Sequence, residues 1–301
     1  MDRRDFIRQM GLGLVAGWAF GRLSWPWQAL ACAPQLRLAL LADAHLKSGA
    51  GLRPEAQALA RAVAEINALT PPPDLVLFAG DLAHKGRPDA LDLGREILSD
   101  LSSPLWAVRG EGDHGRGGAA SWVRRFGPPQ FSRMYQGVHF LGLDTAWRDT
   151  PQGPAFEMGP AQRQWLTTEL AALDSATPLV IVSHAPLARL YLPWQQWTKD
   201  APKITPHLAR FRQVLCLHGH THNAVASKDD DLREIFLTEN RKQQTEYPLH
   251  ISLPATAWPH PQAIQGTPAI VHPGLAPHGC GWTLVTLDTS GVEFRPQLWQ
   301  A

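Results

Sequence analysis

Two histidines two residues apart, His220 and His222, follow a short apolar run at residues 213–217 that is typical of a buried strand. On an extended backbone, side chains at i and i+2 leave the same side of the strand, so the two imidazoles can point to one place. Neutral imidazole is the commonest nitrogen ligand for metals in proteins. The pair therefore predicts half of a metal site, provided that other strands supply partners.

Polar side chains also follow three other apolar runs, at the point where each run ends. They are Asp43 and His45 after residues 36–42, Asp81 after residues 75–79, and His184 after residues 179–182. Taken alone, an aspartate after a strand is usually a turn residue or a helix cap. In α/β sheets, however, ligand sites lie beyond the carboxyl ends of the strands, so these groups can converge. Four such strand ends in one chain indicate a shared site.

Helical patterns separate the apolar runs. Apolar residues recur with a 3.6-residue period at residues 54–69, 89–101 and 160–173. Strands that alternate with helices predict an α/β core in which helices cover a sheet. The C-terminal part instead has strands without helices, at residues 250–253, 270–272, 282–287 and 292–298. We expect these strands to form a second sheet packed against the first, with a hairpin turn at residues 288–291.

The motifs as a set resemble those of the calcineurin-like metallophosphoesterases. The segments concerned are Asp43-x-His45, Gly80-Asp81, His184 and Gly219-His220-x-His222, and the resemblance runs from about residue 36 to the C-terminus. Residues 141–145, 164–166 and 252–256 are similar to the branch that contains the class III cyclic-nucleotide phosphodiesterases. The resemblance implies a four-layer α/β/β/α sandwich of two mixed sheets that holds two divalent metal ions.

The resemblance also implies a role for each candidate ligand. Asp43, His45 and His222 would bind one metal, His184 and His220 the other, and Asp81 would bridge the two. A carboxylate can bridge two cations with its two oxygens, and mixed His/Asp ligands suit Mn, Fe or Zn better than Mg. Paired metals lower the pKa of a shared water and hold phosphoryl oxygens for in-line displacement. We therefore expect a phosphohydrolase that cleaves a phosphomonoester or a phosphodiester.

One loop departs from the family pattern, which has Gly-Asn-His-Asp after the third strand. Here residues 105–108 lead into Arg109-Gly110-Glu111-Gly112-Asp113-His114-Gly115. An ungapped register places Glu111 at the Asn position and leaves Gly112 where the histidine should be. A two-residue insertion would instead make Asp113 the ligand and His114 the acid that protonates the leaving group. We favour Glu111 as ligand because the length from strand to loop is then unchanged, and His114 as acid stays open.

The altered loop motivates a second hypothesis, in which the chain is a degenerate, non-catalytic metal-binding or assembly protein on the same fold. Composition narrows the remaining choices. The chain is 44% hydrophobic and 18% charged with a net charge of +1, which argues against nucleic acid held by charge alone. The expected substrate is a phosphorylated small molecule or an envelope component. Cys216 and Cys280 form no disulfide framework or CxxC zinc site, and a bridge between them stays open.

The first 31 residues have the order of an export signal. Arg3 and Arg4 precede an apolar run at residues 10–20, and the small-residue site at residues 29–31 precedes Cys32. This order predicts a twin-arginine signal at residues 1–31, export by the twin-arginine machinery and a single domain at residues 32–301. The mature protein would be periplasmic or secreted, with no stable membrane span after cleavage. The alternatives are an uncleaved anchor, for which the run is short, and lipidation of Cys32.

Overall fold

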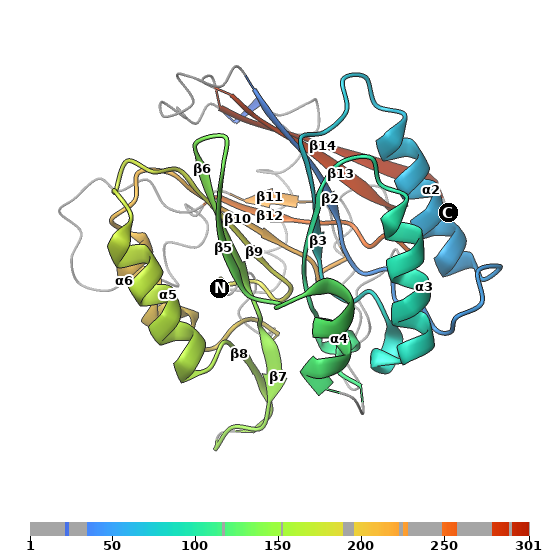
Figure 1. Cartoon of the computed structure of the whole chain (residues 1–301). Coiled ribbons are helices and arrows are strands. Elements are labelled where there is room, and N and C mark those ends of the chain that lie inside the picture. The colour runs from blue at the N-terminus through green and yellow to red at the C-terminus, as the bar shows by residue number, and fades with distance from the viewer. Residues whose placement is uncertain are drawn as a thin grey trace, which may run out of the picture.

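The computed structural model of the chain describes residues 22–23, 35–115, 118–151, 153–188, 196–222, 225–227, 249–257, 279–288 and 291–300. Two six-stranded sheets and a small two-stranded sheet form its framework (Figure 1). In spatial order the first sheet contains β1 (Arg22–Leu23), β14 (Gly291–Gln300), β13 (Gly279–Asp288), β2 (Leu36–Leu41), β3 (Leu75–Ala79) and β4 (Leu105–Val108). β2, β3 and β4 are parallel, whereas β13 is antiparallel to β2.

The second sheet is mixed as well. In spatial order it contains β11 (Val225–Ser227), β12 (Leu249–Ser252), β10 (Val214–His218), β9 (Leu179–Ser183), β6 (Val138–Leu143) and β5 (Phe131–Tyr135). β12, β10, β9 and β6 are parallel, and β11 and β5 are antiparallel edge strands. The two-stranded sheet pairs β7 (Ala146–Arg148) with β8 (Ala155–Glu157). Each sheet therefore has a set of parallel strands whose carboxyl ends can contribute residues to a shared site.

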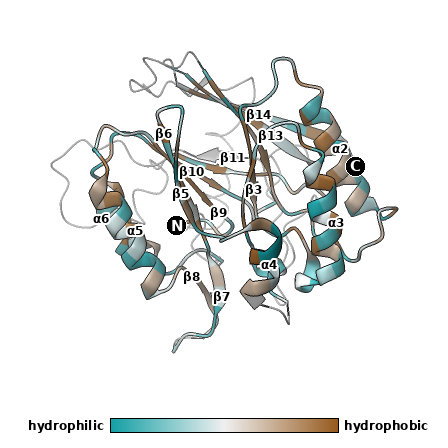
Figure 2. Cartoon of the chain, viewed as in Figure 1, coloured by the Kyte–Doolittle hydropathy of each residue, from teal (hydrophilic) through white to brown (hydrophobic). Residues whose placement is uncertain are grey.

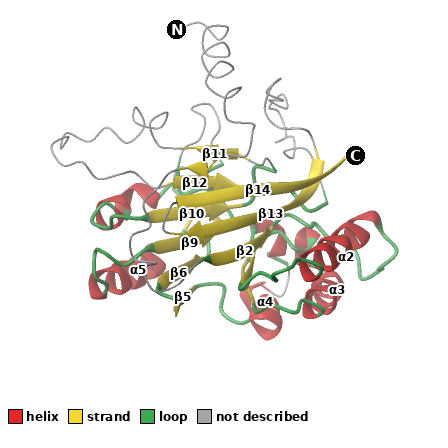
Figure 3. Ribbon diagram, turned by 90° about the horizontal axis from the view of Figure 1, so that it is seen from above, coloured by secondary structure: helices red, strands yellow, loops and turns green. Residues whose placement is uncertain are grey.

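Helices cover the outer face of each sheet, as the view from above shows (Figure 3). α2 (Pro54–Asn67), α3 (Pro88–Ser99) and α4 (Gly118–Phe126) lie on the first sheet, and α5 (Pro160–Ala172) and α6 (Thr205–Leu208) lie on the second. All but α4 have a proline at one of the first two helical positions, where its missing N–H costs no intrahelical hydrogen bond. The predicted helices at residues 54–69, 89–101 and 160–173 correspond to α2, α3 and α5.

Three apolar clusters fill the spaces between the layers. The central cluster lies between the two sheets and includes Leu38 and Leu77 of the first and Val182 and Leu217 of the second. Because side chains alternate along a strand, the intervening residues, such as Phe78, pack outward against the helices. The hydropathy colouring accordingly shows brown strands and two-sided helices (Figure 2). The predicted four-layer sandwich of two mixed sheets is confirmed.

The C-terminal strands correct one expectation. β13 and β14 form the predicted hairpin, in which Asp288 pairs with Gly291, but they extend the first sheet beside β2 instead of building the second sheet. Only β12 and β11 of the C-terminal part, among the described residues, join the second sheet. Hydrophobic alternation shows which face of a strand is buried and carries no information about which strand lies beside it, so the assignment to a sheet was wrong.

Several sequence-based expectations fall partly or wholly outside the described residues. Residues 270–272 and most of the predicted export signal do so, although Arg22 and Leu23 pair with β14 as β1. Removal of residues 1–31 therefore stays a prediction. In the described part of the chain, every helix is too short or too polar to cross a bilayer. Cys216 and Cys280 are both free thiols, on β10 and β13 of different sheets, and they form no bridge.

Candidate metal centre

The strand ends of the two sheets bring seven candidate ligands together. Each follows a parallel strand: Asp43 and His45 after β2, Asp81 after β3, Glu111 after β4, His184 after β9, and His220 and His222 after β10. The loops after β2 and β3 continue to pair beyond the strands, since the His45 N–H donates to the Asp81 carbonyl at 2.9 Å. The site thus lies where the carboxyl ends of both sheets meet.

Left-handed backbone marks the candidate ligands. Seven residues other than glycine have positive φ in the described part of the chain, and five of them are Asp43, His45, Asp81, His220 and His222, with φ between 48° and 65°. A residue with a Cβ pays about 1 kcal/mol or more for this conformation, which persists only where surrounding structure imposes it. The turn it makes directs successive side chains to one point. Neither periodicity nor residue type predicts it, although aspartate and histidine tolerate it better than most residues.

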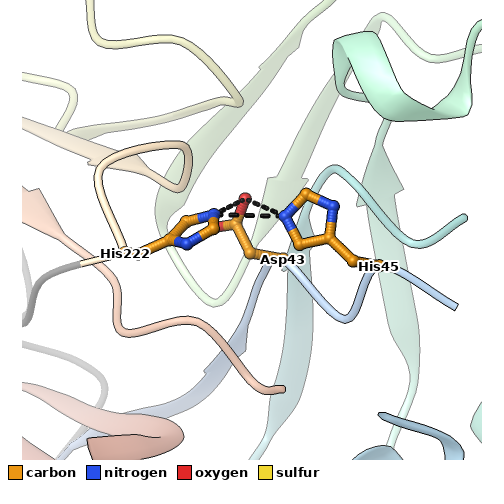
Figure 4. A group of neighbouring side chains, drawn as sticks. All are labelled: Asp43, His45 and His222. Carbon is orange, nitrogen blue, oxygen red and sulfur yellow. Dashed lines mark hydrogen bonds and ion pairs between the residues drawn. The ribbon is translucent and has the colours of Figure 1, made fainter. Parts of the chain in front are cut away.

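Asp43, His45 and His222 form the first group of candidate ligands (Figure 4). Nε2 of His45 lies 3.1 Å from Nε2 of His222, and Oδ1 of Asp43 lies 3.2 Å from His222 and 3.7 Å from His45. All three side chains are at most 4% exposed. Three donor atoms from β2 and β10 therefore face one buried point.

Glu111, His184 and His220 form the second group. Oε2 of Glu111 lies 2.8 Å from Nε2 of His184, and Oε1 of Glu111 lies 3.0 Å from Nδ1 of His220. Asp81 lies between the groups, with one oxygen 3.7 Å from His45 and the other 3.5 Å from His184. The structure thus places Asp81 where one carboxylate reaches donor atoms of both groups.

Further hydrogen bonds orient the imidazoles. The Nδ1 atom of His184 contacts the Ala79 carbonyl at 2.8 Å, which leaves Nε2 facing the site. The Nε2 atom of His220 contacts Oε1 of Gln196 at 2.7 Å, which leaves Nδ1 facing Glu111. Such partners fix the tautomer and the ring orientation of metal-ligating histidines. Gln196 was not predicted, because it lies in a loop with no sequence pattern of its own.

The structure separates the two interpretations of the altered loop. The carboxylate of Asp113 accepts hydrogen bonds from the backbone N–H groups of Asp81, Ala83 and Gly110 at 2.8–3.0 Å, and it is fully buried. Its oxygens therefore hold the loop, and among the described residues Asp113 belongs to none of the candidate ligand groups. Glu111 occupies the position beside His184 and His220, as the ungapped register expects.

His114 directly follows Asp113 in the altered loop. It forms no hydrogen bond with a candidate ligand among the described residues. Its Nε2 atom is buried and lacks a hydrogen-bond partner among the described residues. Burial, followed by the charge of nearby Arg109, lowers the pKa of its imidazole. The Nε2 atom of His114 is therefore uncommitted, and the protonated imidazole is a stronger acid than usual.

A buried ion pair beside the site joins the two sheets. The Arg109 guanidinium at the end of β4 donates to both carboxylate oxygens of Asp144, after β6, at 2.8 and 2.7 Å. Gln162 of α5 holds the Asp144 backbone in two hydrogen bonds of 2.9 Å. The sequence indicated residues 141–145 only as a family match, and nothing in it pairs Asp144 with Arg109.

Two glycines lie directly against the carboxylates of the site. A Cβ at Gly110 would overlap the Asp81 carboxylate, and a Cβ at Gly219 would lie 2.7 Å from Oδ2 of Asp43. Real Cβ atoms do not approach oxygen so closely, so a side chain at either position would displace a candidate ligand. The backbone N–H of Gly112 also donates to Oδ1 of Asp81 at 2.6 Å.

The carboxylates and imidazoles perturb one another electrostatically. Burial opposes ionisation of Asp43, but the facing His222, His184 and His45 lower its pKa to about 2. Burial is the largest cause of the change at His45, whose pKa falls to about 4. Burial also disfavours charge on His184, yet Asp81, Glu111 and Asp43 hold its pKa well above the usual value. In the metal-free protein the carboxylates therefore favour the protonated form of His184, whereas burial favours the neutral form of His45.

The donor set fits divalent metal ions. Oδ1 of Asp43, Oε2 of Glu111 and Nε2 of His184 are buried and have no hydrogen-bond partner among the described residues, although they face other lone-pair atoms closely. Buried polar atoms without partners are costly, and a cation in each group would satisfy Asp43 in the first and Glu111 and His184 in the second. Mixed imidazole and carboxylate ligands suit first-row transition metals.

Comparisons with known proteins agree with this architecture. The chain is 24% identical over 200 residues to a probable glycerophosphodiester phosphodiesterase of Arcobacter nitrofigilis, covering 60% of this chain and 70% of that protein. It is 29% identical over 156 residues to a probable cyclic nucleotide phosphodiesterase of Synechococcus, covering 50% of this chain and 59% of that protein. It is 33% identical over 141 residues to the human serine/threonine-protein phosphatase CPPED1, covering 42% of this chain and 44% of that protein.

Solved structures share the fold at low identity. A dimetal phosphatase from Danio rerio superposes with a TM-score of 0.62 at 15% identity, covering 88% of this chain and 96% of that one. Purple acid phosphatase PPD1 from Lupinus luteus superposes with a TM-score of 0.56 at 14% identity, covering 88% of this chain and 53% of that one. The sequence profile of the calcineurin-like phosphoesterases matches residues 36–224, which hold every candidate ligand. The chain belongs to the calcineurin-like phosphoesterase family.

Proposed function

We propose that the chain is an exported dinuclear-metal phosphohydrolase that cleaves a phosphomonoester or a phosphodiester. The single observation that carries the proposal is the pair of ligand groups on either side of Asp81. Asp43, His45 and His222 would hold one metal, and Glu111, His184 and His220 the other. Asp81, whose two oxygens reach toward both groups, would bridge them.

When bound, two divalent metals would supply an activated water and neutralise charge on the phosphoryl oxygens. The chain's own residues prepare that chemistry. The Ala79 carbonyl and Gln196 hold His184 and His220 so that one nitrogen of each faces the site. Glu111 is 31% exposed at its side chain, whereas Asp43 is fully buried, so substrate would approach from the side of the second group.

Protonation of the leaving group is the step for which the family histidine is missing. Gly112 stands at that position, and its N–H is directed to Asp81. His114 is the neighbouring side chain with an uncommitted nitrogen, so we propose it as the acid. If leaving-group protonation depends on His114, His114→Ala should slow cleavage of an alkyl phosphoester more than that of a p-nitrophenyl ester, which needs no proton.

The experiment that tests the activity is hydrolysis of bis-p-nitrophenyl phosphate by protein loaded separately with Mn²⁺, Fe²⁺, Zn²⁺ and Ni²⁺, together with metal content by mass spectrometry. Turnover with about two metals per chain supports the proposal. Absence of turnover with all four metals, despite tight binding, would favour the non-catalytic alternative. Glu111→Asn, which restores the family residue, is the matched variant, and Glu111→Ala should lose the second metal.

Substrate and location follow from the predicted export signal and from the relatives. A periplasmic or secreted protein would meet envelope phosphodiesters or extracellular nutrients, which suits the glycerophosphodiester class named for one relative. Fusion of residues 1–40 to a folded reporter that only the twin-arginine machinery exports would test the signal. Replacement of Arg3 and Arg4 by lysine should retain the reporter in the cytoplasm. Export unaffected by that change would contradict this route.

A further inference from the structure

A surface cavity of about 330 Å³ lies away from the candidate metal centre, at the open edge of the sandwich. The C-terminal half of α3, edge strand β4, α4 and edge strand β5 enclose it, so it spans the seam between the two sheets. None of the seven candidate ligands is among its lining residues. The cavity is therefore a separate feature of the fold.

Aromatic side chains form the inner wall of the cavity. Half-buried Trp106 of β4 packs edge-on against Phe131 of β5, with ring centroids 5.7 Å apart, and Phe126 of α4 also lines the space. Trp106 also packs edge-on against Phe140, at 5.4 Å, so its ring is held from behind. Trp106, Phe126 and Phe131 together form a preorganised apolar wall for a flat group.

Arginines form the rim. Arg133 places its guanidinium 5.0 Å from the Trp106 ring, and both Arg133 and Arg95 are exposed. Within the described part of the chain, neither guanidinium has a hydrogen bond or an ion-pair contact. The guanidinium of Arg125, which also lines the cavity, instead donates hydrogen bonds to the Asp92 carboxylate and to the backbone carbonyl and hydroxyl of Ser121. Two cations are therefore available beside the aromatic wall.

The local charge balance favours an anion. Hydrogen bonds from Arg125, and the charges of Arg95 and Arg124, lower the pKa of the Asp92 carboxyl, so one acidic group faces three arginines on α3 and α4. Arg133 on the opposite wall adds a fourth positive charge. A guanidinium stacked on an aromatic ring keeps its edge free for a carboxylate, sulfonate or phosphate.

We propose that this cavity binds a flat aromatic anion, with the ring against the wall of Trp106, Phe126 and Phe131 and the anionic group beside Arg95 and Arg133. The volume is near the lower end for ligand pockets, which run from about 300 to 1,000 Å³, and fits a one- or two-ring compound. Binding here requires no metal and is independent of the proposed function.

Isothermal titration calorimetry of the full chain with naphthalene-1-sulfonate tests the proposal. We expect one saturable site with a Kd below about 1 mM, and at least about a tenfold loss of affinity in Arg133→Gln and in Arg95→Gln. Arg212→Gln is the matched control, since Arg212 is exposed and lies outside the cavity lining and outside α3 and α4, and it should bind as the unaltered chain does. Circular dichroism of each variant establishes that it is folded.

Three further titrations test whether the sulfonate is recognised only as an anion, only as an apolar ring, or by the metal centre. Sodium sulfate alone and neutral 2-naphthol should each bind at least about tenfold more weakly than the sulfonate, because each lacks one half of the recognised group. A chelator should leave sulfonate binding unchanged. Equal binding of sulfate or of 2-naphthol, loss of binding with the chelator, or equal weakening in Arg212→Gln would overturn the proposal, as would absence of saturable binding.

Discussion

The two ligand groups of the candidate metal centre differ in how they are held. The first group, Asp43, His45 and His222, is buried, and all three residues have left-handed backbone. In the second group only His220 is left-handed, and its members are held instead by side-chain and backbone partners such as Gln196. Backbone conformation therefore fixes one group, and outer hydrogen bonds fix the other. The groups should respond to different changes.

Loss of a first-group carboxylate should have the largest effect. Asp43→Ala removes a buried oxygen that faces both histidines and a second oxygen that accepts the His220 N–H at 3.0 Å. We expect turnover to fall at least about a thousandfold, equivalent to ~4 kcal/mol of transition-state stabilisation. Metal content and kcat of the purified variant measure this. Asp149→Asn, on an exposed loop, is the control, and equal losses in both variants would show that the effect is not local.

Loss of the Arg109–Asp144 ion pair, which joins the two sheets, should reduce the stability of the protein. Asp144→Ala leaves the Arg109 guanidinium buried without its carboxylate, which costs about 3–5 kcal/mol. Urea unfolding of the metal-free protein measures the change. The exposed Arg87–Asp89 pair supplies the control, because solvent screens this pair and Asp89→Ala should destabilise the protein far less than Asp144→Ala does. Similar losses at the two pairs would contradict the role assigned to Arg109 and Asp144.

Loss of an outer partner should affect only the second group. Gln196→Leu removes the acceptor of His220 and should weaken the binding of one metal by about 10–100-fold, the usual effect of such partners. Competition with a fluorescent chelator measures both affinities. If the tighter and weaker metals change equally, the groups are coupled and the proposed distinction fails. Gln136→Leu, at an exposed turn, is a matched control.

The pH dependence of stability should distinguish the two ligand groups in the metal-free protein. This is the smallest of the expected effects. The pKa of His45 is about 4 when folded and about 6.5 when unfolded, so below pH 6.5 the unfolded chain binds a proton that the folded chain does not. Stability from this residue is therefore lost as pH falls, by about 1 kcal/mol between pH 7 and pH 5.5. His184 has the opposite sign, since its raised pKa stabilises the charged form until pH rises through that value.

Chemical unfolding in the presence of a chelator, repeated across this pH range, measures the two slopes. His45→Gln should flatten the acid limb relative to the unaltered chain, whereas His184→Gln should steepen it. The same sign of change in both variants would show that the first and second groups do not differ in the metal-free state.

The location of the site was predictable because it depends on local rules. Asp43 and Asp81 follow neighbouring parallel strands and so lie at one edge of the first sheet, and their occurrence at strand ends together with His184 and the histidine pair indicated a shared site. The side of the sandwich joined by β13 was not predictable, because strand alternation does not encode the neighbour. Arg109 and Asp144 were missed for the same reason, since their contact depends on how the two sheets face each other.

In the altered loop, the position of Glu111 was predictable from the sequence and the role of Asp113 was not. Constant loop length placed Glu111 beside the histidines, and the structure places it there. The role of Asp113 as acceptor for three backbone N–H groups required coordinates, because an acidic residue near a metal site looks the same in sequence whether it faces the metal or the backbone.

The close approach of Gly110 and Gly219 to the site carboxylates has a consequence for anyone who alters this chain. Neither glycine supplies a candidate metal ligand, so an engineer who protects only the ligands would leave both positions open to randomisation. Libraries that vary them should yield folded, soluble, metal-deficient protein in which every ligand is still present. The metal centre therefore depends on close packing as well as on its ligands. Gly110 and Gly219 belong to it because they leave room for the carboxylates.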